Sequence, residues 1–244
     1  MDIAGKTVLV TGAGGGIGKA SARMFAEQGA AKVVIADIDR TALDRVSEEL
    51  RSWGATPIGK VVDLRDADAV VRLFEDADRE TGGLDIVYNN AGVMGGPPEF
   101  PDADIAKMVA AIQINLIAMM IGTRLSIGQM RRRGAPGVII NAASMAAFGH
   151  LPADPAYTAS KHGILAFCLS CKPLQASCGV RVMAICPGIT DTAIVDHEAP
   201  WLRPALDAVR MLRPEDIADQ IRRIVEDDSL AGGYVKVENP PAGR

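Results

Sequence analysis

The residues whose types and spacing could do chemistry begin with Tyr157 and Lys161, with Ser144 thirteen positions before the tyrosine. Residues four apart on a helix share one face, about one turn from each other. A free tyrosine has a pKa of about 10, and a nearby cation favours its phenolate. Lowering that pKa by about 3 units needs roughly 4 kcal/mol of charge stabilisation. Such a tyrosine could exchange a proton with an alcohol or a ketone near neutral pH, although the same spacing also occurs by chance on exposed helices.

A glycine-rich loop follows the first apolar run of the chain. Thr7–Val10 is typical of a strand, and a helical pattern runs from Ile17 to Gly29. Between a strand and a helix, glycines let backbone N–H groups approach a pyrophosphate, and the helix N-terminus adds partial positive charge. A flexible turn is the alternative interpretation. The predicted cofactor contacts in this loop are Gly12, Gly14, Gly15, Gly16, Ile17 and Gly18.

An acidic residue closes the second predicted strand. Lys32–Ala36 ends at Asp37, nineteen residues beyond Gly18. An acid at this point hydrogen-bonds the ribose hydroxyls of an adenosine and repels a 2′-phosphate, so it favours NAD over NADP. The alternative is an acid at the N-terminus of a helix over 41–50. We also expect Ile38 to contact the cofactor.

Further strands alternate with helices along the rest of the chain. Predicted strands cover 58–62, 84–88, 137–141, 180–185 and 234–237; predicted helices cover 66–81, 105–133, a segment from Tyr157 to about 177, and 215–226. Apolar strands that alternate with helices indicate a parallel sheet covered on both faces. We therefore predict an α/β fold, a single Rossmann-like, doubly wound domain over 1–244 that binds a dinucleotide and carries the catalytic residues.

Ligands in such sheets bind at the carboxyl ends of the strands. Further residues predicted to contact the cofactor fall there: Asp63, Leu64, Asn90, Ala91, Gly92, Pro187 and Gly188, followed by Thr190 and Thr192. The segment over about 190–213 contains Trp201 and Leu202, and it is predicted to be a mobile, apolar substrate lid. A surface segment packed on the core is the alternative. His150 could line the substrate cleft or lie in a solvated loop.

Composition limits the partners. The chain has 244 residues, 48% of them hydrophobic, and a net charge of −4 without a basic patch, so no nucleic-acid partner is expected. No uninterrupted apolar run of about 18 residues and no secretory signal are found, which predicts a cytoplasmic protein without a membrane partner. No set of His, Cys, Asp and Glu has metal-site spacing, so no metal is expected. Cys168 and Cys171 form a C-x-x-C that we interpret as buried structural thiols.

Taken together and in order, these motifs resemble the short-chain dehydrogenase/reductase family over nearly the whole chain. The resemblance implies a nicotinamide cofactor, a small-molecule alcohol or ketone substrate, and a homodimer or homotetramer built on two long helices. It implies that Tyr157 is the general acid/base, that Lys161 lowers the tyrosine pKa and holds the nicotinamide ribose, and that Ser144 hydrogen-bonds the substrate oxygen. Asn115 would fix a water beside Lys161. The motifs are Thr11-Gly12-x-x-x-Gly16-x-Gly18, Asn89-Asn90-Ala91-Gly92, Asn115, Ser144, Tyr157-x-x-x-Lys161 and Pro187-Gly188.

Within the family, the segments 184–194 and 224–232 resemble 15-hydroxyprostaglandin dehydrogenase and its bacterial relatives, which oxidise secondary alcohols with NAD. Those enzymes hold substrate with a glutamine where this chain has Asp154. Pro173 predicts a kink or an early end of the catalytic helix, because proline removes a backbone donor. The leading hypothesis is an NAD-dependent secondary-alcohol dehydrogenase. An NAD(P)H-dependent carbonyl or acyl-thioester reductase and a non-catalytic dinucleotide sensor are the alternatives.

Overall fold

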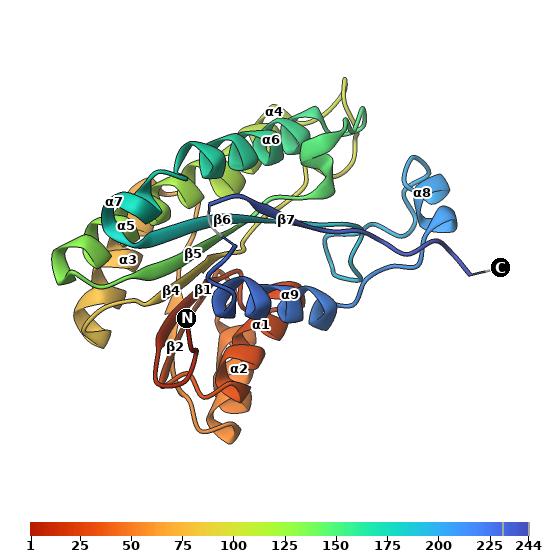
Figure 1. The fold of residues 1–244 in the computed structure, drawn as a ribbon. Coiled ribbons are helices and arrows are strands. Elements are labelled where there is room, and N and C mark those ends of the chain that lie inside the picture. Colours follow the sequence, from red (N-terminus) through yellow and green to blue (C-terminus); the bar gives the residue numbers. More distant parts are fainter. Residues whose placement is uncertain (231, 244) are drawn as a thin grey trace.

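The computed structural model describes residues 1–230 and 232–243; Ala231, which belongs to the segment 224–232 compared above, lies outside them. Seven parallel strands form one sheet in the order β3-β2-β1-β4-β5-β6-β7 (Figure 1). The predicted doubly wound α/β fold is therefore confirmed. The strands are β1 (Thr7–Thr11), β2 (Lys32–Asp37), β3 (Thr56–Val61), β4 (Ile86–Asn89), β5 (Gly137–Ala142), β6 (Val180–Pro187) and β7 (Tyr234–Val237).

Helices cover both faces of the sheet (Figure 1). One face carries α1 (Gly16–Glu27), α2 (Arg40–Ser52) and α9 (Pro214–Glu226); the other carries α3 (Ala67–Thr81), α4 (Ile105–Ile112), α5 (Ala118–Arg133) and α6 (Pro155–Ser170). Alternate strand residues divide between the two cores because strand side chains point to opposite faces in turn. Val8 and Val10 pack beneath α1, whereas Leu9 between them packs beneath α3 and α5.

The long helix predicted over 105–133 is interrupted by a π-helical turn, η1 (Gln113–Ile117), between α4 and α5. Such π-turns occur frequently at functional sites. By length and composition the whole stretch from Ile105 to Arg133 could cross a membrane, although its apolar residues are interrupted by polar ones. Here it is a helix of the fold: α5 packs on α3, and α4 packs on α6.

The helix that carries Tyr157 and Lys161 ends early, as predicted. α6 stops at Ser170, and Pro173 is the N-cap of a separate short helix, α7 (Leu174–Cys178). The thiols of this region are free; Cys168 is buried, and burial raises its pKa to about 12, whereas Cys171 is half-buried. Two short elements complete the chain near the carboxyl edge of the sheet, the 3-10 helix η2 (Met145–Phe148) and α8 (Arg203–Ala208).

Candidate active site

One cavity of about 1240 Å³ runs across the carboxyl ends of the strands and gathers most of the predicted site residues. Parallel strands direct their carboxyl ends to the same edge of the sheet, so residues far apart in the sequence meet there. The predicted residues that line it are Gly12, Gly15, Gly16, Ile17, Asp37, Ile38, Asp63, Leu64, Asn90, Ala91, Gly92, Ser144, Tyr157, Lys161, Pro187, Gly188, Thr190 and Thr192. Three predicted residues, Gly14, Gly18 and Asn115, lie behind its wall.

The glycines behind the wall shape the loop rather than face the cavity. A Cβ atom on Gly18 would lie 2.0 Å from the carbonyl oxygen of Gly12, so only glycine lets α1 approach the loop this closely. A Cβ atom on Gly14 would lie 2.9 Å from the carboxylate of Asp37, to which the Gly14 N–H donates at 2.8 Å. Close backbone packing therefore explains both residues.

Asp37 faces the cavity and does not cap a helix. Its second carboxylate oxygen accepts a hydrogen bond from the N–H of Asp39 at 3.1 Å. Asp39 is the N-cap of α2, accepting from the N–H of Ala42 at 3.1 Å. The capping group of this helix is therefore Asp39, and Asp37 lies two residues before it. Asp37 lies at the end of β2 and lines the cavity.

The strand-end acid Asp63 is paired with a residue that was not predicted. The Nε and Nη2 atoms of Arg65 donate to its two carboxylate oxygens at 3.0 and 2.5 Å. This hydrogen bonding lowers the pKa of Asp63. Arg65 also lines the cavity. The position of Arg65, two residues after a strand-end acid, could have indicated this pair from the sequence, but Arg65 was not predicted.

The catalytic helix places Lys161 one turn below Tyr157, but its ammonium does not bond the phenol. Lys161 is 4% exposed, and its Nζ donates to the carbonyl of Ala142 at 2.7 Å. The Nζ atom lies 5.4 Å from the centre of the Tyr157 ring. Burial lowers the pKa of Lys161 to about 8.

The pKa of Tyr157 differs from the sequence expectation. Burial raises it, the hydrogen bond with Ser144 lowers it, and the negative charge of Asp154 raises it further. The predicted lowering by Lys161 is not found here, because that ammonium is desolvated and directed to a backbone carbonyl. In this structure the pKa of Tyr157 is therefore raised and not lowered.

The polar residues beside Tyr157 are held by backbone groups. The Ser144 hydroxyl accepts from the N–H of Ala146 at 3.1 Å and lies 3.5 Å from the carbonyl of Pro187. Asn115, in η1, donates to the carbonyl of Val93 at 2.9 Å and to the hydroxyl of Ser160 at 3.1 Å. Both N–H bonds of the Asn115 amide are thus used. A water beside Lys161 would have to donate to an oxygen of Asn115.

Asp154 is turned towards the backbone, not towards a substrate. It is 7% exposed and caps α6, with one oxygen accepting from the N–H of Tyr157 at 2.9 Å. Its other oxygen accepts from the N–H of Gly95 at 2.7 Å, so it ties one cavity wall to the catalytic helix. The glutamine-like, substrate-holding role is therefore not open to this side chain as it lies here.

Asp154→Asn should move the pH dependence of alcohol oxidation to lower pH. The substitution removes a charge that raises the pKa of Tyr157, so the phenolate needed to accept the alcohol proton forms at lower pH. An asparagine oxygen can still cap the helix, whereas the bond from the N–H of Gly95 is lost. The measurement is kcat/KM against pH. Asp104→Asn, in the exposed N-cap of α4, is the control and should leave the profile in place. An unmoved or alkaline-shifted profile in Asp154→Asn would contradict this role of the charge.

Beyond the catalytic residues the cavity is mainly apolar. Val93, Met94, Met145, Leu151, Ile194 and Trp201 are among the residues that line this part. Residues of the segment 190–213 thus close one side of it. His150 lines the cavity too, and it is an exposed residue outside the helices and strands, so both positions considered for it apply.

The base of the segment 190–213 is held by Asn239, which no sequence pattern indicated. Its side chain accepts from the N–H of Ile189 at 2.7 Å and donates to the carbonyls of Ile189 and Arg210 at 2.7 and 3.1 Å. One amide from the C-terminal tail therefore holds both ends of the segment. A long-range contact of this kind leaves no local signal in the sequence.

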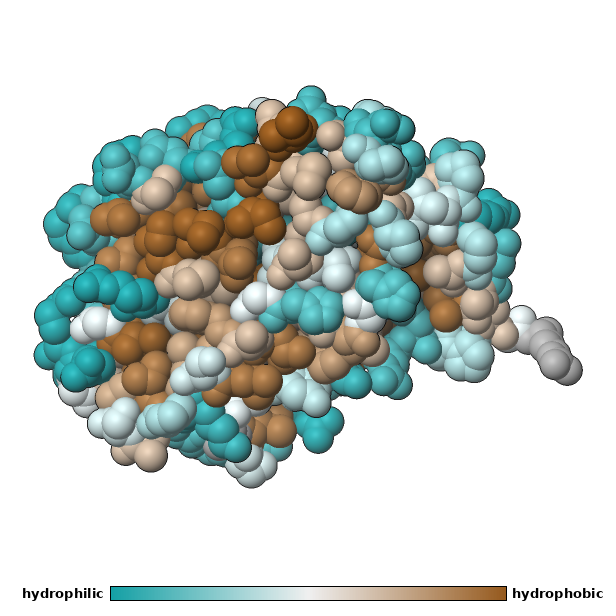
Figure 2. All heavy atoms as spheres, turned by 90° about the horizontal axis from the view of Figure 1, so that it is seen from above, coloured by the Kyte–Doolittle hydropathy of each residue, from teal (hydrophilic) through white to brown (hydrophobic). Residues whose placement is uncertain are grey.

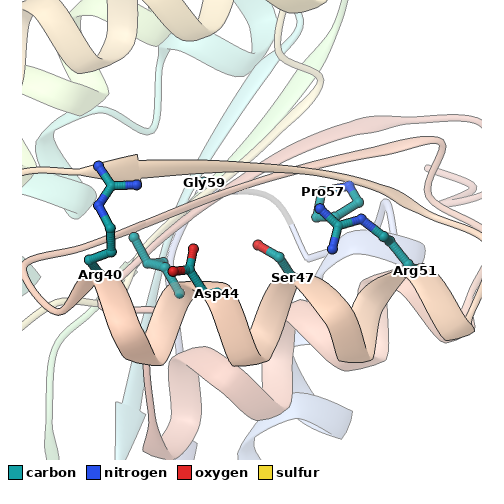
Figure 3. Close-up of a pocket in the computed structure, with 7 residues that line it drawn as sticks. Arg40, Asp44, Ser47, Arg51, Pro57 and Gly59 are labelled. Atoms are coloured by element: carbon teal, nitrogen blue, oxygen red, sulfur yellow. The ribbon is translucent and has the colours of Figure 1, made fainter.

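A second, smaller cavity of about 240 Å³ lies between α2 and the edge strand β3. Arg40 and Arg51 stand at its two ends, with Asp44 and Ser47 between them on the same helix (Figure 3). It holds none of the predicted site residues. Over residues 1–230 and 232–243, no three His, Cys, Asp or Glu side chains gather as metal ligands.

A doubly wound sheet whose cavity joins a glycine loop, a strand-end acid and a Ser, Tyr and Lys set defines a dinucleotide-dependent oxidoreductase. The family model described as "short chain dehydrogenase" matches residues 6–203, and the chain belongs to this family.

Named relatives agree with this assignment. The chain is 38% identical to a 1-deoxy-11-beta-hydroxypentalenate dehydrogenase of Streptomyces exfoliatus over 80% of this chain and 71% of the relative. It is 32% identical to a cis-4-hydroxycyclohexanecarboxylate dehydrogenase of Sinomonas cyclohexanicum over 95% and 97% of the two chains. The crystal structure of a short-chain type dehydrogenase/reductase from Mycobacterium marinum superposes with a TM-score of 0.87 at 25% identity, covering 97% of this chain and 95% of that one.

Proposed function

We propose that the protein is an NAD-dependent oxidoreductase that interconverts a secondary alcohol and a ketone, with Tyr157 as the general acid/base. The observation that carries this proposal is that Ser144, Tyr157 and Lys161 line the same cavity as the glycine loop and Asp37. The family implies a dinucleotide, and the residues present fit one. A Cβ atom on Gly12 would lie 2.8 Å from the Cα of Ala91, so the loop leaves bare backbone beside the cavity.

Each group of residues in the cavity then has a separate role. Asp37 would hold the adenosine ribose, the glycine loop the pyrophosphate, and Lys161 the nicotinamide ribose. A bound nicotinamide supplies the hydride acceptor or donor. Ser144 would orient the substrate oxygen, and Tyr157 would take the alcohol proton during oxidation or return it to the ketone during reduction. The apolar wall excludes water from the reacting carbon.

Both named relatives act on hydroxylated acids, to judge from the substrates in their names. We propose that the substrate of this chain shares what these substrates have in common, a secondary alcohol on an apolar carbon skeleton. The resemblance of 184–194 and 224–232 to 15-hydroxyprostaglandin dehydrogenase supports the same direction, oxidation with NAD. We further propose a single domain over 1–244 in which the segment 190–213 is the substrate lid.

NAD should be preferred to NADP by about 10- to 150-fold in kcat/KM, measured with a panel of cyclic secondary alcohols. Asp37 would accept ribose hydrogen bonds and repel a 2′-phosphate, and hydrogen bonds to a charged group contribute about 1.5–3 kcal/mol, or roughly 10- to 150-fold. Asp37→Ala should remove most of this preference, whereas Asp39→Asn, next to it at the helix cap, should keep it. A wild-type preference for NADPH would instead favour the carbonyl or acyl-thioester reductase, and NAD binding without turnover would favour the sensor.

We also propose a homodimer or homotetramer built on the long helices. Figure 2 shows apolar side chains gathered on the face formed by α4, α5 and α6. Ile105, Val109, Ile117 and Leu169 on these helices are 78%, 49%, 41% and 44% exposed. Contiguous apolar surface of this kind marks interaction sites. A monomer in sedimentation velocity at micromolar concentration would contradict the assembly.

A further inference from the structure

The apolar part of the cavity carries a cation that the proposed reaction does not use. Lys107, Ala110 and Ile114 of the α4–η1 helix all line it. Their spacing of three and four residues puts them on one helix face, directed to the cavity. Ile114 precedes Asn115, which bonds the catalytic helix through Ser160. With a rise of about 1.5 Å per residue, Lys107 stands about 11 Å along the helix from Ile114.

The ammonium of Lys107 retains binding capacity. Its Nζ donates to the carbonyl of Pro97 at 2.9 Å, which uses one of its three N–H bonds. Within the described part of the chain, no carboxylate lies within ion-pair distance of it. The side chain is exposed, so it stands at the mouth of the cavity and not in its depth.

Two acidic residues near this mouth, Asp104 and Asp154, bond backbone N–H groups. Asp104 caps α4 by accepting from the N–H of Ala106 at 2.7 Å, and Asp154 is tied to the N–H groups of Tyr157 and Gly95. The cavity-lining carboxylates in the described chain, Asp37 and Asp63, belong to the adenosine end. The part of the cavity that would hold substrate thus has an apolar wall, a cation at its mouth and no facing carboxylate.

We propose that the substrate is a secondary alcohol that also bears a carboxylate, and that Lys107 binds this carboxylate at the cavity mouth. This inference rests on the proposed function. The apolar residues that line the cavity beside Tyr157 and Lys107 favour an acid whose hydroxyl and carboxylate groups are joined by a hydrocarbon skeleton.

The test compares matched substrates with the full-length protein and NAD: a cyclic or bicyclic hydroxy acid, its methyl ester, and the parent alcohol without a carboxyl group. The wild type should oxidise the acid with a kcat/KM about tenfold above that for the ester. This is the effect expected from one charged hydrogen bond at a partly exposed site. Lys107→Gln should remove this preference through KM while kcat changes little. Lys107→Glu should reverse it.

Lys172→Gln, which makes the same change of charge at an exposed turn away from the cavity, should keep the preference for the acid. Turnover of the parent alcohol shows that each variant is folded and active. Equal use of acid and ester by the wild type, or a preference that survives Lys107→Gln, would overturn the role of Lys107 while the proposed function stands. Absence of turnover of all three compounds would instead overturn the proposed function.

Discussion

Tyr157→Phe should lower kcat for alcohol oxidation by about 10²- to 10⁴-fold, the range that a positioned general acid/base contributes. The substitution removes only the phenol oxygen. The ring remains beside Lys161, whose Nζ lies 5.4 Å from its centre, so the packing of the cavity is kept. The affinity for NAD, measured by calorimetric titration, should change by less than about threefold, because the adenosine and pyrophosphate contacts are elsewhere in the cavity.

Tyr88→Phe is the matched control for the loss of a hydroxyl. Tyr88 is fully buried in β4, and its hydroxyl has no hydrogen-bond partner in the described structure. Removing a buried, unsatisfied hydroxyl should leave turnover intact and the free energy of unfolding unchanged or higher. If Tyr157→Phe kept more than a tenth of the wild-type kcat, proton transfer would have to be assigned to another group.

Gly18→Ala should damage both folding and NAD binding. The added methyl group would lie 2.0 Å from the carbonyl oxygen of Gly12 and 2.6 Å from the Nδ2 atom of Asn90, which itself bonds that carbonyl at 3.2 Å. Helix α1 would have to move away from the loop. We expect the free energy of unfolding to fall by about 3 kcal/mol and NAD affinity to fall by more than tenfold. Denaturant titration and calorimetry measure the two effects.

Gly15→Ala, in the same loop, separates the clash between helix α1 and the loop from the effect of adding any side chain to the loop. A Cβ atom on Gly15 would meet no heavy atom within 4 Å. The φ angle of Gly15 is −163°, an extended conformation that any residue can adopt. This variant should be as stable as the wild type. Equal losses in Gly15→Ala and Gly18→Ala would show that the loop tolerates no side chain at all, and that the close approach of α1 is not the cause.

Local patterns predicted the elements of the fold well and their ends less well. Each predicted strand forms, but the third runs over Thr56–Val61 rather than 58–62. The observed strand includes Pro57 because β3 is an edge strand, where proline is tolerated since one side of the strand needs no ladder partner. Pro173 ended the catalytic helix as expected because its effect is local and steric.

By itself, the sequence determined the order of strands and helices, the glycine loop, and the residues that meet at the carboxyl edge of the sheet. Hydrophobic period and strand-end position are local properties, and parallel pairing converts them into a shared site. Tertiary structure alone decided the direction of the Asp154 carboxylate, the bonds from Asn239 to Ile189 and Arg210, the position of Lys107 and the raised pKa of Tyr157. These depend on burial and on contacts between distant segments, and a linear pattern carries neither.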